Sequence, residues 1–254
     1  MRIINSIKGE FSTRTIVLIP IAIAINIAVG QLLIYLKLPI YLDSIGTVLV
    51  GALVGPWAGA LTGALANVIW GLTLYPQAMF FFYVAAVIGA MAGIAAKMGA
   101  FERSSPRWLS ALIGAFFFFG LTLFILSITS YSRDFVIPNA GDLVRNNSIV
   151  FITIVVIGLA IGYFFLRRAG YAGLAGLITG VVAAILSAPT AAIVFGGVTG
   201  AGTDLLVAAF RASGANILAS TMAQGAVSDP FDKMVSFLIV WLILQSLPAR
   251  YKVR

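Results

Sequence analysis

Long apolar runs separated by short polar breaks dominate the pattern of this chain. The runs are continuous rather than alternating, which favours helices over the strands of a membrane barrel. Several runs reach the length of about 20 residues that a helix needs to cross a hydrocarbon core of ~30 Å. We therefore predict an all-α, polytopic transmembrane helical bundle of about eight helices. The predicted helices cover residues 14–36, 44–54, 56–74, 78–98, 108–130, 148–166, 171–194 and 234–247, with an amphipathic segment at 204–224.

The segment 43–70 carries the most informative local pattern. Small residues four apart lie on one helix face and let another backbone come close, which is how helices pack in lipid. Pro56 interrupts the run and is a typical first-turn residue. We therefore predict two short helices hinged at Gly55–Pro56, with polar groups returning to one membrane side. The four regularly spaced glycines are Gly51, Gly55, Gly59 and Gly63.

Composition supports a membrane protein without a soluble domain. Of the 254 residues, 61% are hydrophobic and only 9% are charged, and the mean hydropathy is +1.08. Soluble domains carry far more charge. The polar gaps are too short to build an independent core. We therefore expect one integral membrane domain over 1–254 and no ATPase module on this chain. The triplet 22–24 resembles a signal-peptide cleavage site but lies inside an apolar run, so we expect no cleaved signal.

The absence of Cys and His excludes several kinds of chemistry. It removes thiolate and imidazole metal sites, haem and iron–sulfur ligation by these residues, and nucleophilic catalysis by Cys or by a Ser–His pair. We expect no metal, no cofactor and no enzymatic activity. The net charge of +8 could suggest a nucleic-acid partner, but its distribution fits a membrane topology better, and we expect no nucleic acid.

Basic residues are distributed unevenly about the predicted crossings. With eight crossings and the N-terminus inside, eleven of the 16 basic residues fall at inner ends, as the positive-inside rule favours. This predicts that both termini are cytoplasmic. The inner set is Arg2, Lys8, Arg14, Lys97, Arg103, Arg107, Arg167, Arg168, Arg250, Lys252 and Arg254, and the outer set is Lys37, Arg133, Arg145, Arg211 and Lys233.

Polar residues of separate segments share the predicted outer face, together with the loop 131–147. A mostly apolar pocket with a few placed polar groups suits a small organic ligand. The alternative is that these polar residues are merely solvated and that the aromatic residues form an interfacial belt. Asp232 and Lys233 could equally cap the start of the last helix. The candidate ligand-binding residues are Asp43, Asn67, Trp70, Tyr75, Gln77, Asp204, Asn216, Gln224 and Asp229.

Three features together resemble a known family. They are an alanine pair on the first helix, the segment LDSIGTVLVGALVGPWAGALTGALANVIWG, and the DPFDK segment (229–233) before the last helix. The chain resembles the S components, the substrate-binding subunits, of energy-coupling factor (ECF) transporters. The family usually has six helices, so the helices at 108–130 and 148–166 would be an added pair.

The resemblance implies a function and partners. It implies a multi-pass protein of a bacterial or archaeal cell membrane that binds a vitamin or related micronutrient. It also implies a transmembrane coupling subunit and two ATPase subunits as partners, because S components have no energy source of their own. Ala24 and Ala28 would contact the coupling subunit. The absence of a phosphate-binding G-x-x-x-x-G-K-[ST] motif is consistent with this expectation.

Two other classes of function remain open. A stand-alone secondary transporter would require an ionisable residue near the middle of the membrane, and the predicted helix middles contain none. An integral membrane enzyme would have only aspartates at one face for its chemistry. The sequence does not identify the substrate.

Overall fold

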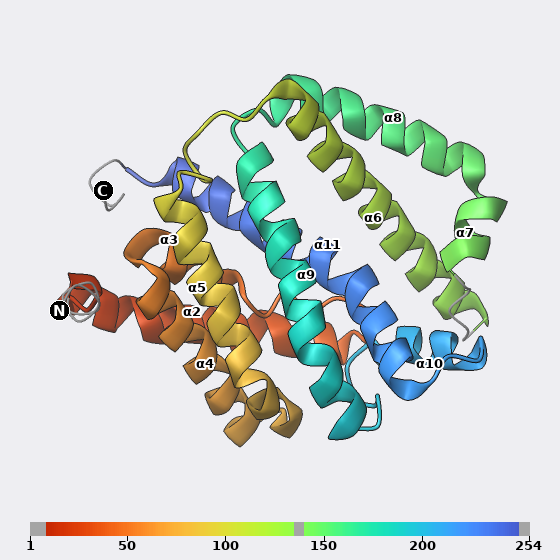
Figure 1. Cartoon of the computed structure of the whole chain (residues 1–254), viewed down its shortest axis with the longest axis horizontal. Helices are drawn as coiled ribbons and strands as arrows, with labels where there is room; N and C mark the ends of the chain where they lie inside the picture. The colour runs from red at the N-terminus through yellow and green to blue at the C-terminus, as the bar shows by residue number, and fades with distance from the viewer. Residues whose placement is uncertain (1–8, 135–139, 249–254) are drawn as a thin grey trace.

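The computed structural model describes residues 9–134 and 140–248, and the described chain is helical without strands (Figure 1). The predicted all-α bundle is thus confirmed. The charged ends used in the topology argument, among them Arg2 and Arg254, lie outside the described residues. The elements are α2 (Thr13–Tyr35), α3 (Ile45–Val54), α4 (Pro56–Thr73), the 3-10 helix η1 (Pro76–Phe81), α5 (Phe82–Lys97), α6 (Arg107–Asp134), α7 (Ala140–Asn146), α8 (Ser148–Phe165), α9 (Gly170–Ile193), α10 (Asp204–Ala212) and α11 (Ile217–Ser246).

The helices fall into three groups (Figure 1). Helices α2 to α5 pack against one another on one side, and α9 and α11 form an extensive central contact. On the other side, α6 and α8 form a hairpin joined through α7 and touch the centre mainly through α6. The two helices predicted at 108–130 and 148–166 therefore form a peripheral hairpin beside the remaining helices.

The hinge at Gly55 is present as predicted. Gly55 has a φ of 143°, a value that glycine adopts far more readily than other residues, and it separates α3 from α4. The buried Glu10 side chain lies directly behind it. Its Oε2 atom accepts hydrogen bonds from the backbone N–H groups of Trp57 (2.8 Å) and Ala58 (3.0 Å). A carboxylate at these unpaired N–H groups stabilises the start of α4 and so fixes the hinge.

Glycines let α3, α4 and α5 approach to backbone contact. A Cβ atom added at Gly51 would lie 2.6 Å from the carbonyl oxygen of Gly89, and one added at Gly89 would overlap the carbonyl of Gly59. These positions tolerate only hydrogen. The small-residue spacing in the sequence thus reflects close helix packing, as expected for helices in lipid.

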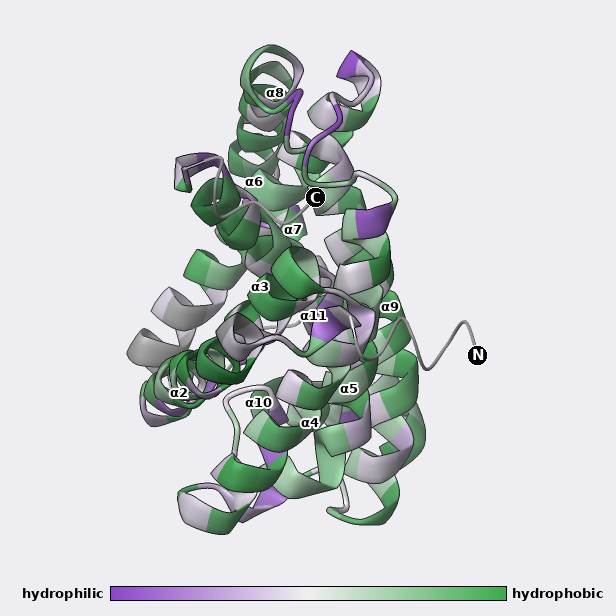
Figure 2. Ribbon diagram, turned by 90° about the vertical axis from the view of Figure 1, so that its left-hand side faces the viewer, coloured by the Kyte–Doolittle hydropathy of each residue, from purple (hydrophilic) through white to green (hydrophobic). Residues whose placement is uncertain are grey.

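Five of the described helical segments are long and apolar enough to cross a membrane. Hydrophobic residues colour most of each helix in Figure 2, and many large apolar side chains are exposed on the outside of the bundle. The chain is therefore a multi-pass membrane protein by its helix lengths and surface. The five segments are Thr15–Tyr35, Pro76–Lys97, Arg107–Ser127, Ser148–Phe165 and Gly170–Ile193.

Three predictions of helix or loop bounds are wrong. The predicted amphipathic helix 204–224 ends at Ala212, and α11 then runs without a break from Ile217 through the predicted helix start at 229–233. Asn216 caps α11, because its Oδ1 atom accepts the backbone N–H of Ala219 at 2.8 Å. The DPFDK segment therefore lies in the middle of a 30-residue helix and caps nothing. The described part of the predicted loop 131–147 is also largely helical, in α6 and α7, and residues 135–139 lie outside the described residues.

Candidate functional site

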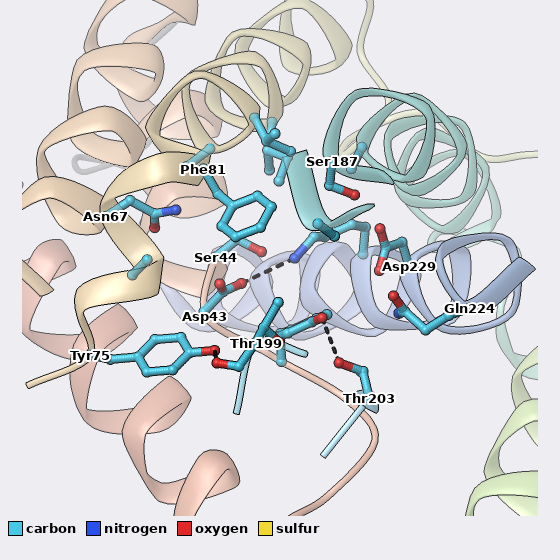
Figure 3. A pocket seen from close by; sticks show the side chains of 18 of the residues that line it. Asp43, Ser44, Asn67, Tyr75, Phe81, Ser187, Thr199, Thr203, Gln224 and Asp229 are labelled. Atoms are coloured by element: carbon cyan, nitrogen blue, oxygen red, sulfur yellow. Dashed lines mark hydrogen bonds and ion pairs between the residues drawn. The ribbon is translucent and has the colours of Figure 1, made fainter. Parts of the chain in front are cut away.

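A cavity lies between the end of α4, the first half of α5, the second half of α9 and the middle of α11 (Figure 3). Its volume is about 90 Å³. Apolar side chains form most of its wall, and polar groups come from five separate segments of the chain. This is the usual constitution of a site for a small organic molecule.

Seven of the nine predicted ligand-binding residues line this cavity. They are Asp43, Asn67, Trp70, Tyr75, Asp204, Gln224 and Asp229. Asn216 is an exposed residue that caps α11, and the half-buried Gln77 lies in η1 outside the cavity lining. Residues up to 186 positions apart in the sequence are thus brought to one space.

A charged cluster forms the floor beside α3. The buried Lys233 amine lies 3.1 Å from Asp43 Oδ1 and 2.5 Å from Asp232 Oδ2. The other Asp232 oxygen accepts the backbone N–H of Leu42 at 2.7 Å. Leu42 has a φ of 47°, so this bond holds the turn before α3 in an unfavourable backbone conformation. One lysine therefore balances two carboxylates, and it fixes Asp43 at the edge of the cavity.

A second polar chain runs along α11 on the same side. Gln224 Nε2 donates to Ser228 Oγ (2.7 Å), and Ser228 Oγ donates to Asp229 Oδ1 (3.0 Å). The Ser228 hydroxyl has one proton, which goes to the carboxylate, so the Gln224 group that faces Ser228 must be its NH2. Gln224 Oε1 and Asp229 Oδ2 then remain as acceptors, and neither has a hydrogen-bond partner among residues 9–134 and 140–248.

Asn67 faces this pair from the opposite side of the cavity, with Phe81 between them (Figure 3). The Asn67 side chain is only 7% exposed, and its amide has no hydrogen-bond partner in the described chain. A buried amide without a partner costs free energy, and a bound molecule can supply the missing bonds. Trp70 differs, because its indole N–H donates to Gln31 Oε1 at 2.8 Å and its ring packs beside Tyr75.

The glycine-rich segment 195–203 closes one side of the cavity. Its tether is Asp204, whose carboxylate accepts the backbone N–H of Thr199 (3.0 Å), the Thr199 hydroxyl (2.8 Å) and the N–H of Gly200 (2.6 Å). Asp204 therefore shapes the segment and has little capacity left for a ligand. Tyr75 donates to the Thr199 carbonyl at 2.7 Å. Burial raises the pKa of Tyr75 to about 12, so its hydroxyl remains a donor at neutral pH.

The apolar wall was missed by reasoning from polar residues. Phe81 at the end of η1 and Val84, Ala85 and Ile88 on α5 line the cavity, and on α9 Ala183 and Ala191 do so on either side of the polar Ser187. Both sets are spaced three or four residues apart, the period of one helix face. That period was the available signal, but it does not distinguish a cavity wall from an ordinary packing face.

The predicted coupling residues lie on the outside of α2. Ala24 and Ala28 are both exposed, whereas the nearby Ala22 and Asn26 are buried and face the bundle. Asn26 is 2% exposed and binds α3 twice, through Thr47 Oγ1 and the backbone N–H of Gly46, both at 2.7 Å. The alanine pair is therefore free of the inner packing of the bundle.

The arrangement offers binding more readily than bond-making chemistry. The polar groups at the cavity are carboxylates, amides, hydroxyls and the Lys233 amine, most of which position one another, and the rest of the lining is largely apolar. Comparison of the chain with protein-family models, with curated proteins and with solved structures finds no match.

Proposed function

We propose that this protein is the substrate-binding membrane subunit of an ECF-type importer for a vitamin-like solute, energised by a separate coupling subunit and two ATPases. The cavity carries the proposal, because it gathers polar groups of distant segments into a small, mostly apolar space. The resemblance of the segment 42–71 and of the alanine pair to S components supplies the class of transporter.

The outer face of α2 supports a contact with a coupling subunit. Ala24 and Ala28 lie one turn apart on an exposed surface, so a helix of a partner can approach there closely. The exposed Ile21 and Ile25 stand beside them. Larger side chains at the two alanines would point away from the core and obstruct only an external partner.

The test replaces both alanines by tryptophan. The Ala24→Trp, Ala28→Trp double variant should fold and retain bound solute, but it should lose uptake in cells and co-purification with a coupling subunit. The buried Ala22→Trp variant is the matched control, because it sits against Gly46 and should disrupt the bundle itself. Unchanged uptake and complex formation in the double variant would refute the coupling role.

The structure also strengthens the alternative of a secondary transporter. The sequence argument against it was that no ionisable residue lies in a helix middle, and this is wrong for α11. Asp229, Asp232 and Lys233 are all buried near the centre of that helix. In transporters, buried carboxylates that lie within the membrane serve as proton or cation relays, and these residues would be candidates for that role if α11 crosses the membrane.

Reconstitution separates the two functions. Purified protein alone in vesicles should not accumulate solute under a proton or sodium gradient if it is an S component. Accumulation driven by such a gradient, without ATP and without other subunits, would establish the secondary transporter instead.

We further propose a cell-membrane location with both termini cytoplasmic, which the basic-residue asymmetry supports. The chain lacks Cys, so single cysteines report sidedness cleanly. Lys37→Cys should react with a membrane-impermeant maleimide from outside the cell, and Arg103→Cys only after the membrane is opened. Both positions are exposed in the structure. The reverse labelling pattern would invert the topology.

A further inference from the structure

We infer that the cavity is built for an organic cation, an aromatic or otherwise flat molecule that carries a protonated nitrogen group. This inference rests on the proposed solute-binding function and names the class of solute. Its basis is the set of polar atoms that the protein leaves unused at the cavity wall.

Two of the free groups on α11 are acceptors. The hydroxyl proton of Ser228 is committed to Asp229, so the order of donors leaves Gln224 Oε1 and Asp229 Oδ2 as acceptors open to a ligand. Both residues line the cavity and are at most 7% exposed. Two neighbouring acceptors, one of them a carboxylate, match a group with two N–H donors and a positive charge, such as an amidinium or an amino-substituted heteroaromatic ring.

The surrounding charges favour the same sign. When all three are ionised, Lys233, Asp43 and Asp232 carry one net negative charge, and the Asp229 carboxyl group lies beside them at the same cavity. The only basic side chain at the described cavity wall is Lys233, and it is held by two carboxylates. In a space of low dielectric this surplus attracts a cation and repels an anion.

The remaining wall suits a flat ring. Phe81, Trp70 and Tyr75 supply aromatic side chains, and the face of an aromatic ring attracts a cation. Across from the acceptors stands the unpartnered amide of Asn67, which offers one donor face and one acceptor face to the far edge of a ligand (Figure 3). The cavity would thus orient a bound molecule with its charged end at Asp229 and its neutral polar end at Asn67.

Three probes of one shape and different charge test this. Benzamidine is a cation, benzamide is neutral and benzoate is an anion, and all three share the same ring. Binding is measured by calorimetry with the whole protein in nanodiscs of uncharged phosphatidylcholine. We expect benzamidine to bind at least tenfold more tightly than benzamide and benzoate to bind weakest.

Single substitutions test which residues cause the preference for the cationic probe. Asp229→Asn keeps an acceptor for Ser228, so it should fold, and it should reduce the preference for benzamidine over benzamide to less than twofold. Asn67→Ala should weaken benzamidine and benzamide by a similar factor. Asp142→Asn, an exposed residue in the first turn of α7, is the matched control and should change nothing. Thermal unfolding of each variant reports its fold.

The outcomes separate the class of solute from the function itself. Equal binding of benzamide, a preference for benzoate, or no binding of any probe would overturn the cationic class. Mass spectrometry of the solute released from the same preparation then decides the function. A neutral or anionic solute that is lost in Asn67→Ala leaves the binding function intact, whereas no released solute together with no probe binding overturns both.

Discussion

Removing the Lys233 amine should destabilise the protein far more than removing any surface lysine. The Lys233 side chain is 5% exposed and lies between Asp43 and Asp232, whose side chains are 20% and 0% exposed. Lys233→Met keeps the length of the side chain but leaves two carboxylates without their counter-charge. Breaking a buried ion pair by removing one partner costs about 3–5 kcal/mol, most of it from the uncompensated charge.

Lys97 provides a matched control within the same chain. It pairs with Glu10 at 3.3 Å, but its side chain is 56% exposed, so water screens the pair. Exposed ion pairs contribute about 0–1 kcal/mol. Lys97→Met should therefore cost at most a third of what Lys233→Met costs. Equilibrium unfolding in mixed micelles of increasing denaturing detergent measures both free energies.

A compensating change tests the cause. Asp232→Asn added to Lys233→Met removes one stranded charge and still offers an oxygen to the N–H of Leu42. The double variant should recover about half of the lost free energy of unfolding, because the loss comes from an uncompensated charge and not from altered packing. If Lys233→Met costs no more than Lys97→Met, or if Asp232→Asn makes it worse, the charge-balance account of this cluster is refuted.

Three further predictions concern packing and the cavity wall. Asn26→Ala strands the N–H of Gly46 and should cost about 1–3 kcal/mol of stability in the same unfolding assay; a neutral result would show that the bond contributes nothing. Gly89→Ala forces a methyl group into the Gly59 carbonyl and should cost about 1–3 kcal/mol, and an unchanged midpoint would contradict the close approach. Asp204→Ala should speed amide hydrogen exchange in the segment 195–203 without lowering global stability; unchanged protection would contradict its tethering role.

The sequence predicted the helices well because hydrophobic runs and breakers act locally. Gly55 and Pro56 marked the hinge correctly, since a glycine with positive φ and a first-turn proline leave signals in the residues themselves. Hydrophobic runs and helix breakers did not fix how many of the helices cross the membrane. Helix α3 has 10 residues and is therefore shorter than a spanning helix in isolation.

The DPFDK segment shows where local reasoning fails. A proline with acidic neighbours is typical of a helix start, yet Pro230 lies within α11. The helix continues through this segment because its buried charged groups have distant partners. Asp232 accepts the N–H of Leu42 and Lys233 donates to Asp43, and both partners are 190 residues away in the chain. Partners so distant in the chain cannot be recognised from a short stretch of sequence.

The positions of polar residues in an apolar chain were more informative. Seven of the nine candidate residues chosen in this way line the cavity, because buried polar side chains gather where they can pair.

The hydrogen bonds that tie the glycine-rich segment 195–203 to the rest of the molecule also limit how often this wall of the cavity can open. Lys37 donates to the Gly200 carbonyl at 3.0 Å, Tyr41 and Thr203 share a bond of 2.7 Å, and Tyr75 holds Thr199. At about 1 kcal/mol each, these three bonds hold the wall shut by about 3 kcal/mol. Since 1.4 kcal/mol corresponds to a factor of ten, an open wall accounts for less than about one molecule in a hundred. For a solute that binds as we propose and passes this wall, the small open fraction lowers the rate constants of entry and of exit by the same factor, so the bound solute would be retained through brief changes in its concentration.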